Sequence, residues 1–212
     1  MDTGNEAAAV CYEYVMAVQP TLRELAFEEA LRELDSGAAF VDLRPTDAYL
    51  EVHVPGSLAL LYEFGPGMPV RTRDCLPLDL PLIILDFDNG DTGHAAAGLR
   101  GKGFTVLGKT DNAINNWVAR GGKPASTEVI TGRRAPEGMI LDVADPGANV
   151  PDGATRIPAD LLWDRVDEVK GQTRVLVAAG YGVRAALCIG ILERAGINEI
   201  VFWKTTSEGL KT

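Results

Sequence analysis

Three aspartates follow one apolar run near the middle of the chain. The run 82–85 leads into Asp86, Asp88 and Asp91, and an alanine-rich segment begins at Thr92. This order predicts a buried strand, a polar loop and a helix. Such a loop gathers backbone N–H groups and the positive end of the helix dipole around one point. Carboxylates there can attack phosphorus as nucleophiles or hold a cation, so the loop is a candidate chemical site.

A second strand–loop–helix pattern lies further along the chain. The apolar run 175–179 leads into a glycine-rich loop, and a second apolar helix follows it. Backbone N–H groups and one arginine in such a loop can hold an anion without reacting with it. We predict a small anion as the ligand of this loop. Its candidate binding residues are Gly180, Tyr181, Gly182, Val183, Arg184 and Ala185.

Phosphatase chemistry is one interpretation of the first loop. The sequence Asp86-Phe87-Asp88 is similar to the first motif of the haloacid-dehalogenase phosphatases, in which the first aspartate is the nucleophile and both carboxylates bind Mg²⁺. In that motif a threonine or valine stands two residues after the second aspartate, where this chain has Gly90. A magnesium-dependent phosphatase using Asp86 and Asp88 is therefore a minor alternative.

Composition excludes several other functions. The net charge is −10, and lysines and arginines are scattered, which argues against binding nucleic acid or anionic membranes. The chain has only two histidines and three widely spaced cysteines, so we expect no metal site and no cofactor. Apolar runs are too short to cross a membrane, and the start of the chain is acidic. With free thiols, these features predict a cytoplasmic protein.

The elements that position the two loops alternate between strand and helix, and their order is repeated. Alternation predicts parallel sheets with helices on both faces. The run 40–43 recurs as 140–143, so the pattern predicts an internal duplication. We expect an N-terminal extension at 1–20, a first domain at 21–124, a linker at 125–135 and a shorter second domain at 136–212. The proline-rich segment 65–80 is expected to be a loop.

Five residues before the first loop carry a family resemblance: Asp42, Arg44, His53, Pro55 and Gly56. Their spacing resembles the signature of the rhodanese homology family, and the resemblance extends over 21–124. It is weaker over 129–212. The arrangement is also similar to the paired rhodanese modules of fusions with a metallo-β-lactamase-fold persulfide dioxygenase. The implied fold is α/β, with two small doubly wound parallel-sheet domains in tandem.

This resemblance implies sulfur chemistry but places no cysteine where that chemistry needs one. In active rhodaneses a loop cysteine takes a sulfane sulfur from thiosulfate or a persulfide and passes it on. The resemblance assigns this position to Asp86 in the first copy and Ala179 in the second. We therefore predict a degenerate first loop and no catalytic residue. The loop comprises Asp86, Phe87, Asp88, Asn89, Gly90, Asp91 and Thr92.

The favoured function is accordingly non-catalytic. We expect a binding, scaffolding or regulatory module linked to sulfur metabolism, with a protein partner or a second copy of itself. The alternative is an active sulfurtransferase that uses a displaced cysteine, chosen from Cys11, Cys75 and Cys188. Among these, Cys75 is expected in a loop and Cys188 inside an apolar helix in the core.

The signature residues also have structural interpretations. Asp42 and Asp142 end apolar runs, where a carboxylate commonly accepts backbone N–H groups. Arg44 is expected to pair with a nearby carboxylate, Asp47 or Glu51. His53 precedes a Pro-Gly turn and is expected to be a hydrogen-bonded residue of that turn.

Overall fold

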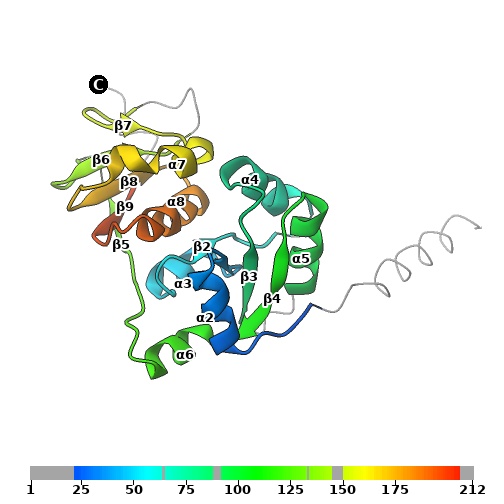
Figure 1. The fold of residues 1–212 in the computed structure, drawn as a ribbon. Helices are drawn as coiled ribbons and strands as arrows, with labels where there is room; N and C mark the ends of the chain where they lie inside the picture. The colour runs from blue at the N-terminus through cyan, green and yellow to red at the C-terminus, as the bar shows by residue number, and fades with distance from the viewer. Residues whose placement is uncertain (1–21, 64, 88–91, 133, 145–149, 206–212) are drawn as a thin grey trace, which may run out of the picture.

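Two parallel β-sheets organise the chain in the computed structural model (Figure 1). The structure describes residues 22–63, 65–87, 92–132, 134–144 and 150–205. The predicted N-terminal extension and the loop residues Asp88, Asn89, Gly90 and Asp91 lie outside these ranges. None of the described helices is long and apolar enough to cross a membrane.

The first sheet has four parallel strands in the order β2-β1-β3-β4. They are β1 (Ala39–Asp42), β2 (Leu58–Ala59), β3 (Leu82–Asp86) and β4 (Val106–Asp111). The helices of this domain are α2 (Phe27–Asp35), α3 (Thr46–Glu51), α4 (Gly67–Cys75), α5 (Thr92–Gly101) and α6 (Ala113–Ala119).

Helices cover both faces of this first sheet, as the prediction requires. Successive side chains of a strand point to opposite faces. Ile83 and Leu85 of β3 pack in one apolar cluster with residues of α2 and α6. Leu82 and Ile84 pack in the other cluster with residues of α4 and α5. Strand β3 is therefore buried on both faces, and its carboxyl end can open only at the edge of the layers.

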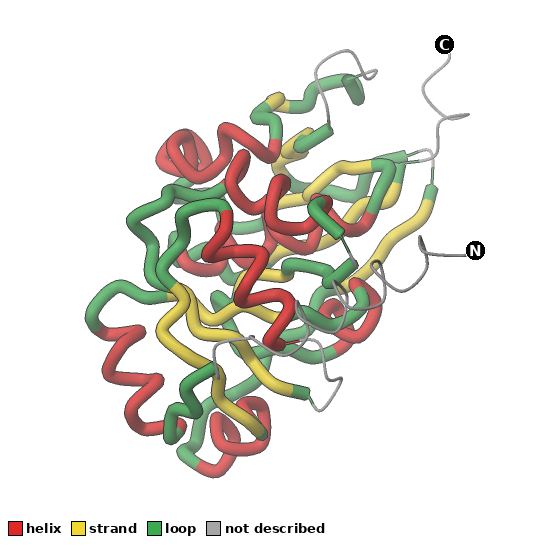
Figure 2. The backbone as a smooth tube through the Cα atoms, turned by 90° about the vertical axis from the view of Figure 1, so that its right-hand side faces the viewer, coloured by secondary structure: helices red, strands yellow, loops and turns green. Residues whose placement is uncertain are grey.

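The second sheet has five parallel strands in the order β5-β9-β8-β6-β7. They are β5 (Glu128–Thr131), β6 (Met139–Asp142), β7 (Thr155–Arg156), β8 (Val175–Ala179) and β9 (Ile200–Lys204). Its helices are α7 (Ala159–Arg165), the 3₁₀ helix η1 (Val166–Val169) and α8 (Gly182–Arg194). Figure 2 shows helices packed along the strands of both sheets.

Described helices of the second domain all lie on one face of its sheet, which differs from the predicted pattern. Val175 and Val177 of β8 share a cluster with residues of α7 and α8. The opposite face is crossed by the connection from β5 to β6. There the Trp203 indole donates to the Gly132 carbonyl at 3.0 Å, and Gly138 approaches Leu176. On this face the described connection is therefore a loop and contains no helix.

Two other predictions need correction. Segment 65–80 is not all loop, because it contains α4. Its prolines resemble helix breakers, but Pro66 is the N-cap and Pro69 lies in the first turn, where no intrahelical N–H bond is lost. The expected linker 125–135 contains β5, which pairs with β9. Most of β5 is exposed, so its sequence lacks the apolar alternation of a core strand.

Helix α8 joins the two domains. It packs on β8 of its own sheet and also on β2 and α3 of the first domain (Figure 1). One apolar cluster runs without a break from Val41 and Ile84 in the first domain to Ile189 and Phe202 in the second. The two domains therefore share one core, and the helix that follows the second loop is at its centre.

Candidate functional site

The carboxylate at the end of β3 is held by a lysine. Lys109 of β4 lies with its Nζ 2.6 Å from Asp86 Oδ2, and the Asp86 side chain is only 10% exposed. Strand register explains this contact, because Ile84 pairs with Lys109 and Asp86 pairs with Asp111. Same-face residues two positions apart on neighbouring strands can reach each other diagonally. The sequence prediction did not identify this lysine.

Arg44 connects the family signature to the first loop. Its guanidinium donates to both carboxylate oxygens of Asp42, with an Nη2–Oδ2 distance of 2.6 Å, and to the Val52 carbonyl at 2.7 Å. The guanidinium also lies 4.0 Å from the centre of the Phe87 ring. The predicted partners Asp47 and Glu51 are wrong, because Arg44 pairs with Asp42, whose charge is buried at the strand end and needs a partner.

A shallow cavity of about 280 Å³ lies beside this arginine and the carboxyl end of β3. Its lining residues are Arg44, Asp86, Phe87, Asn112, Ile114 and Asn115. A nucleophile at the end of β3 would face this space. Its described wall offers a carboxylate paired with lysine, an arginine already bound to Asp42, and two amides.

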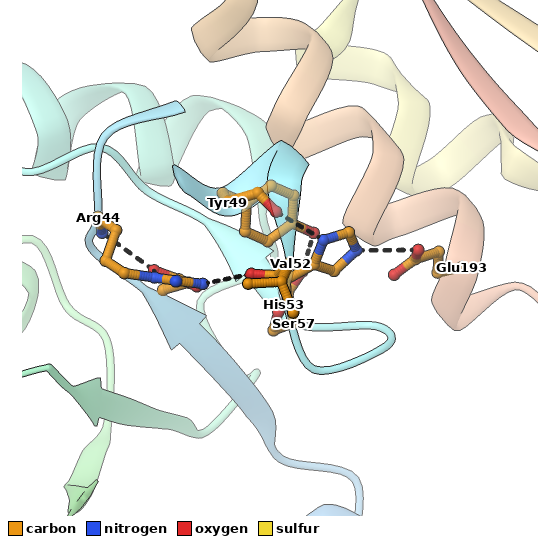
Figure 3. A network of polar contacts seen from close by, with 7 residues as sticks. Arg44, Tyr49, Val52, His53, Ser57 and Glu193 are labelled. Carbon is orange, nitrogen blue, oxygen red and sulfur yellow. Dashed lines mark hydrogen bonds and ion pairs between the residues drawn. The ribbon is translucent and has the colours of Figure 1, made fainter. Parts of the chain in front are cut away.

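The signature turn contacts the second domain (Figure 3). His53 is fully buried and stacks on Tyr49, with the ring centres 4.0 Å apart. Its Nδ1 lies 2.8 Å from the Tyr49 carbonyl, and its Nε2 lies 3.0 Å from Glu193 Oε1 of α8. The second oxygen of Glu193 accepts the Gly56 N–H at 2.7 Å. His53 is thus a hydrogen-bonded turn residue as expected, but half of its bonding comes from the other domain.

Both ring nitrogens of His53 face oxygen atoms. The Tyr49 carbonyl can only accept, so Nδ1 donates to it. An ionised Glu193 can also only accept, so the 3.0 Å contact requires a proton on Nε2 or on the carboxyl group. This arrangement suits a structural contact between domains, because the ring has no free nitrogen for a substrate.

The second copy repeats the carboxylate of the signature with a different arginine. Asp142 is 2% exposed and accepts the Ala144 N–H at 3.0 Å, as Asp42 accepts the Arg44 N–H at 3.0 Å. Its ion pair comes from Arg156 of β7, 2.7 Å away. Both aspartates therefore accept a backbone N–H group, as the sequence predicted, and each forms an ion pair with an arginine.

The second loop lies against the first domain. Ala179 ends β8 and is buried, Gly180 and Tyr181 are exposed, and α8 begins at Gly182. A side chain at Gly182 would press on Thr46 of α3, with 2.9 Å between the added Cβ and the Thr46 methyl. The loop therefore opens at the contact between the domains, where Arg184 lines a second cavity.

This second cavity brings Arg184 together with Cys75. Its volume is about 330 Å³, and the described residues that line it come from both domains. Cys75 is the last residue of α4 and is not in a loop, contrary to the prediction. The pKa of its thiol is raised from 9.0 to about 11, first by burial and then by the charges of Asp160 and Asp74, against the smaller lowering effects of Arg184 and Arg71. No local pattern in the sequence indicates that these two residues lie in the same cavity.

Cys188 is a core thiol, as expected. It is fully buried in α8, and burial raises the pKa of its thiol well above the ordinary value. Neither described cysteine is at the carboxyl end of a central strand. Cys11 lies outside the described residues. Within the described ranges, no group of three or more His, Cys, Asp or Glu side chains is placed to hold a metal ion.

The chain is an α/β protein of the rhodanese class. It has parallel sheets whose central strands end in a loop and a helix, and a buried Asp-Arg pair lies next to them. A curated relative, the thiosulfate sulfurtransferase GlpE of Pseudomonas syringae pv. syringae, is 32% identical over 93 residues, which make up 42% of this chain and 78% of that protein. The chain belongs to the rhodanese family of sulfurtransferases. No protein-family model matches it.

The chain is also similar to solved structures, at lower identity. A thiosulfate sulfurtransferase from Pseudomonas aeruginosa has a TM-score of 0.40 and 17% identity over 89% of this chain. The chain spans 44% of the length of that protein. The polysulfide-sulfur transferase homodimer of Wolinella succinogenes has a TM-score of 0.38 and 17% identity, over 59% of this chain and 94% of that one.

Proposed function

We propose that this chain is a non-catalytic member of the rhodanese family that acts as a binding, scaffolding or regulatory module. The observation that carries the proposal is the ion pair between Asp86 and Lys109 at the end of β3. The family resemblance assigns the sulfur-carrying cysteine to that position. A carboxylate whose charge is balanced by a lysine cannot hold a persulfide.

The second loop supports the same conclusion. The assigned position is Ala179, whose methyl group has no nucleophilic atom and is buried. Backbone N–H groups and Arg184 remain, so this loop keeps the means to bind without the means to react. A small anion as its ligand, and a protein partner or second copy, stay predictions.

Displaced-cysteine catalysis finds little support in the described thiols. A persulfide carrier reacts as a thiolate, and a thiol is activated by a lowered pKa. Cys75 shows the opposite, with a pKa raised to about 11, and Cys188 is fully buried. Catalysis through Cys75 would need a substrate that offsets the effect of Asp160 and Asp74 on the pKa of this thiol.

One observation favours the phosphatase alternative. Lys109 and Asp111 lie at the end of β4 beside Asp86, which supplies a cation and a second carboxylate next to the candidate nucleophile. The test is magnesium-dependent release of phosphate from a generic aryl phosphate. Our proposal would be replaced if the unmodified chain released phosphate and the Asp86→Asn variant did not. Asp111→Asn is the companion variant, and both variants must keep the fold.

Sulfur loading is the direct test of the non-catalytic proposal. The purified chain is incubated with thiosulfate or with glutathione persulfide, and intact mass is measured with an active rhodanese as the positive control. We expect no added sulfur on the chain under conditions that load the control. A sulfur adduct that maps to one cysteine, passes to a thiol acceptor and disappears in the matching Cys→Ser variant would overturn the proposal.

A further inference from the structure

The cavity between the domains has an apolar floor. It lies between α4 of the first domain and α7 and α8 of the second, with a volume of about 330 Å³. Leu60, Met68 and Leu187 line its base and are each no more than 5% exposed. Pockets of this size with an apolar lining and a few polar groups are typical of small-molecule sites.

Four charged side chains surround this floor, and each domain supplies one of each sign. Arg71 and Asp74 come from α4, Asp160 comes from α7, and Arg184 comes from α8. All four line the same cavity as Cys75, and their charges shift the pKa of its thiol. Arg71 also pairs with Glu63 at 2.8 Å, through an exposed contact that a ligand carboxylate can replace.

We propose that this cavity binds a zwitterionic molecule of about the size of an amino acid, with an apolar side chain. The ligand carboxylate is placed between Arg71 and Arg184, and its ammonium group between Asp74 and Asp160. The apolar side chain occupies the floor formed by Met68 and Leu187. This inference rests on the proposed function, since it names a ligand class for a module that binds without reacting.

Charge balance favours a zwitterion over a simple anion. Two arginines and two aspartates leave the lining with no net charge. An anion would pair with the arginines but would be repelled by the two carboxylates. A cation would pair with the carboxylates but would be repelled by the two arginines. Cys75 is suited to this environment as a neutral thiol, because its raised pKa keeps it uncharged at neutral pH. A neutral thiol adds soft, weakly polar surface that suits an apolar or thioether side chain.

Calorimetric titration can test the charge requirement. The probes are L-methionine, L-leucine and L-norleucine, together with two methionine analogues that each keep one charge: the decarboxylated amine and the deaminated acid. We expect at least one amino acid to bind, and both analogues to bind about tenfold more weakly or worse, since each loses a charge-assisted contact. Equal binding of the acid would overturn the proposal in favour of an anion site. Absence of binding by all three amino acids would overturn it as well.

Matched variants test the location. Arg184→Gln and Asp160→Asn remove one charge each. Arg120→Gln is the control, because Arg120 is exposed just after the end of α6 and pairs with Glu28 outside the cavity. We expect the first two to weaken binding about tenfold or more and the control to leave it unchanged. Circular dichroism verifies the fold of each variant. Unchanged affinity in folded Arg184→Gln and Asp160→Asn would contradict the assignment.

Protection of Cys75 gives a second readout on the unmodified chain. Maleimide labelling of this thiol, identified by peptide mapping, should slow when the bound amino acid fills the cavity. A labelling rate at Cys75 that a saturating ligand leaves unchanged would place the ligand elsewhere. Failure here is separate from failure of the proposed function: sulfur loading would overturn the non-catalytic module, whereas lost protection would overturn only the ligand site.

Discussion

Asp86 is the residue on which the proposed non-catalytic function depends most. It stands at the carboxyl end of β3, where the rhodanese resemblance expects a cysteine, and its carboxylate faces Lys109. A partly buried ion pair resists removal of either partner, because the charge that is left must be hydrated or neutralised. The pair therefore stabilises the carboxyl end of β3, and under our proposal this position carries no sulfur nucleophile.

Lys109→Met tests this ion pair. The Asp86 side chain is 10% exposed, so loss of the ammonium leaves a poorly hydrated carboxylate. We expect the free energy of unfolding, measured by urea titration, to fall by about 1–3 kcal/mol. The double variant Asp86→Asn with Lys109→Met should regain part of that loss, since no charge remains unpaired. An unchanged free energy in the single variant would show that the pair does not stabilise the fold.

The titration of Cys75 provides a second test at the residue scale. Its pKa is raised from 9.0 to about 11 by burial and by Asp160 and Asp74. The folded state therefore holds the thiol proton more tightly than the unfolded chain. The stability from this group is complete below pH 9.0 and is lost as the pH rises toward about 11. The rate of iodoacetamide alkylation at Cys75 in the folded protein should rise across this pH window. In the urea-unfolded chain, the rate should level off just above the ordinary pKa of a thiol. If the alkylation rate of the folded protein levelled off near pH 9.0, that result would contradict the raised pKa of Cys75.

At the scale of elements, α8 is the piece on which both domains depend. It follows the second loop, packs on its own sheet and lies on β2 and α3 of the first domain. Gly190 allows this approach, because a Cβ there would collide with the Ser57 carbonyl oxygen and come within 3.1 Å of the Tyr49 hydroxyl. The helix can therefore dock closely only with glycine at this position.

Gly190→Ala should separate α8 from the first domain. We expect the free energy of unfolding to fall by about 1–3 kcal/mol, because the added methyl group meets rigid backbone. Gly101→Ala is the matched control, since this helical glycine has open space around it and should be neutral or slightly stabilising. Thermal and urea unfolding of the two variants measure the difference. Equal stability of the two would show that the interface can shift to admit a methyl group.

For the whole molecule, one core and several polar contacts hold the domains together. The apolar cluster is continuous between the sheets, and Glu193 binds both His53 and the Gly56 N–H across the interface. A protein with a shared core should unfold in a single cooperative transition. Cooperation of this kind would fix the interdomain cavity, because its two walls could not separate without unfolding.

Glu193→Ala and Glu193→Gln distinguish the parts of this contact. Alanine leaves His53 Nε2 and the Gly56 N–H without their partner, so the free energy of unfolding should fall by about 2–3 kcal/mol. Glutamine can accept from Gly56 and donate to a neutral His53, so most of the stability should remain. Circular dichroism and tryptophan fluorescence should report the same midpoint in each variant. Equal damage by both substitutions would mean that the charge of Glu193, and not its hydrogen bonds, is essential.

Local patterns in the sequence determined the fold of each domain. Apolar runs before glycine-rich or polar loops predicted β3 and β8, and the signature spacing around Asp42 and His53 predicted the family. These features depend on near neighbours, such as the Arg44 N–H on Asp42 two residues away. Prolines in the first turn of α4 and the exposed side chains of β5 gave misleading local signals, because caps and edge strands do not follow core patterns.

The tertiary structure alone decided which groups meet. His53 and Glu193 are 140 residues apart in the sequence, and neither has a neighbour that indicates the other. The same is true of Cys75 and Arg184, which share a cavity because α8 packs against the first domain. Periodicity tells which face of a helix is buried, but not which surface it packs against. The sequence could therefore place the two loops, and only the packing of α8 could place a candidate site between the domains.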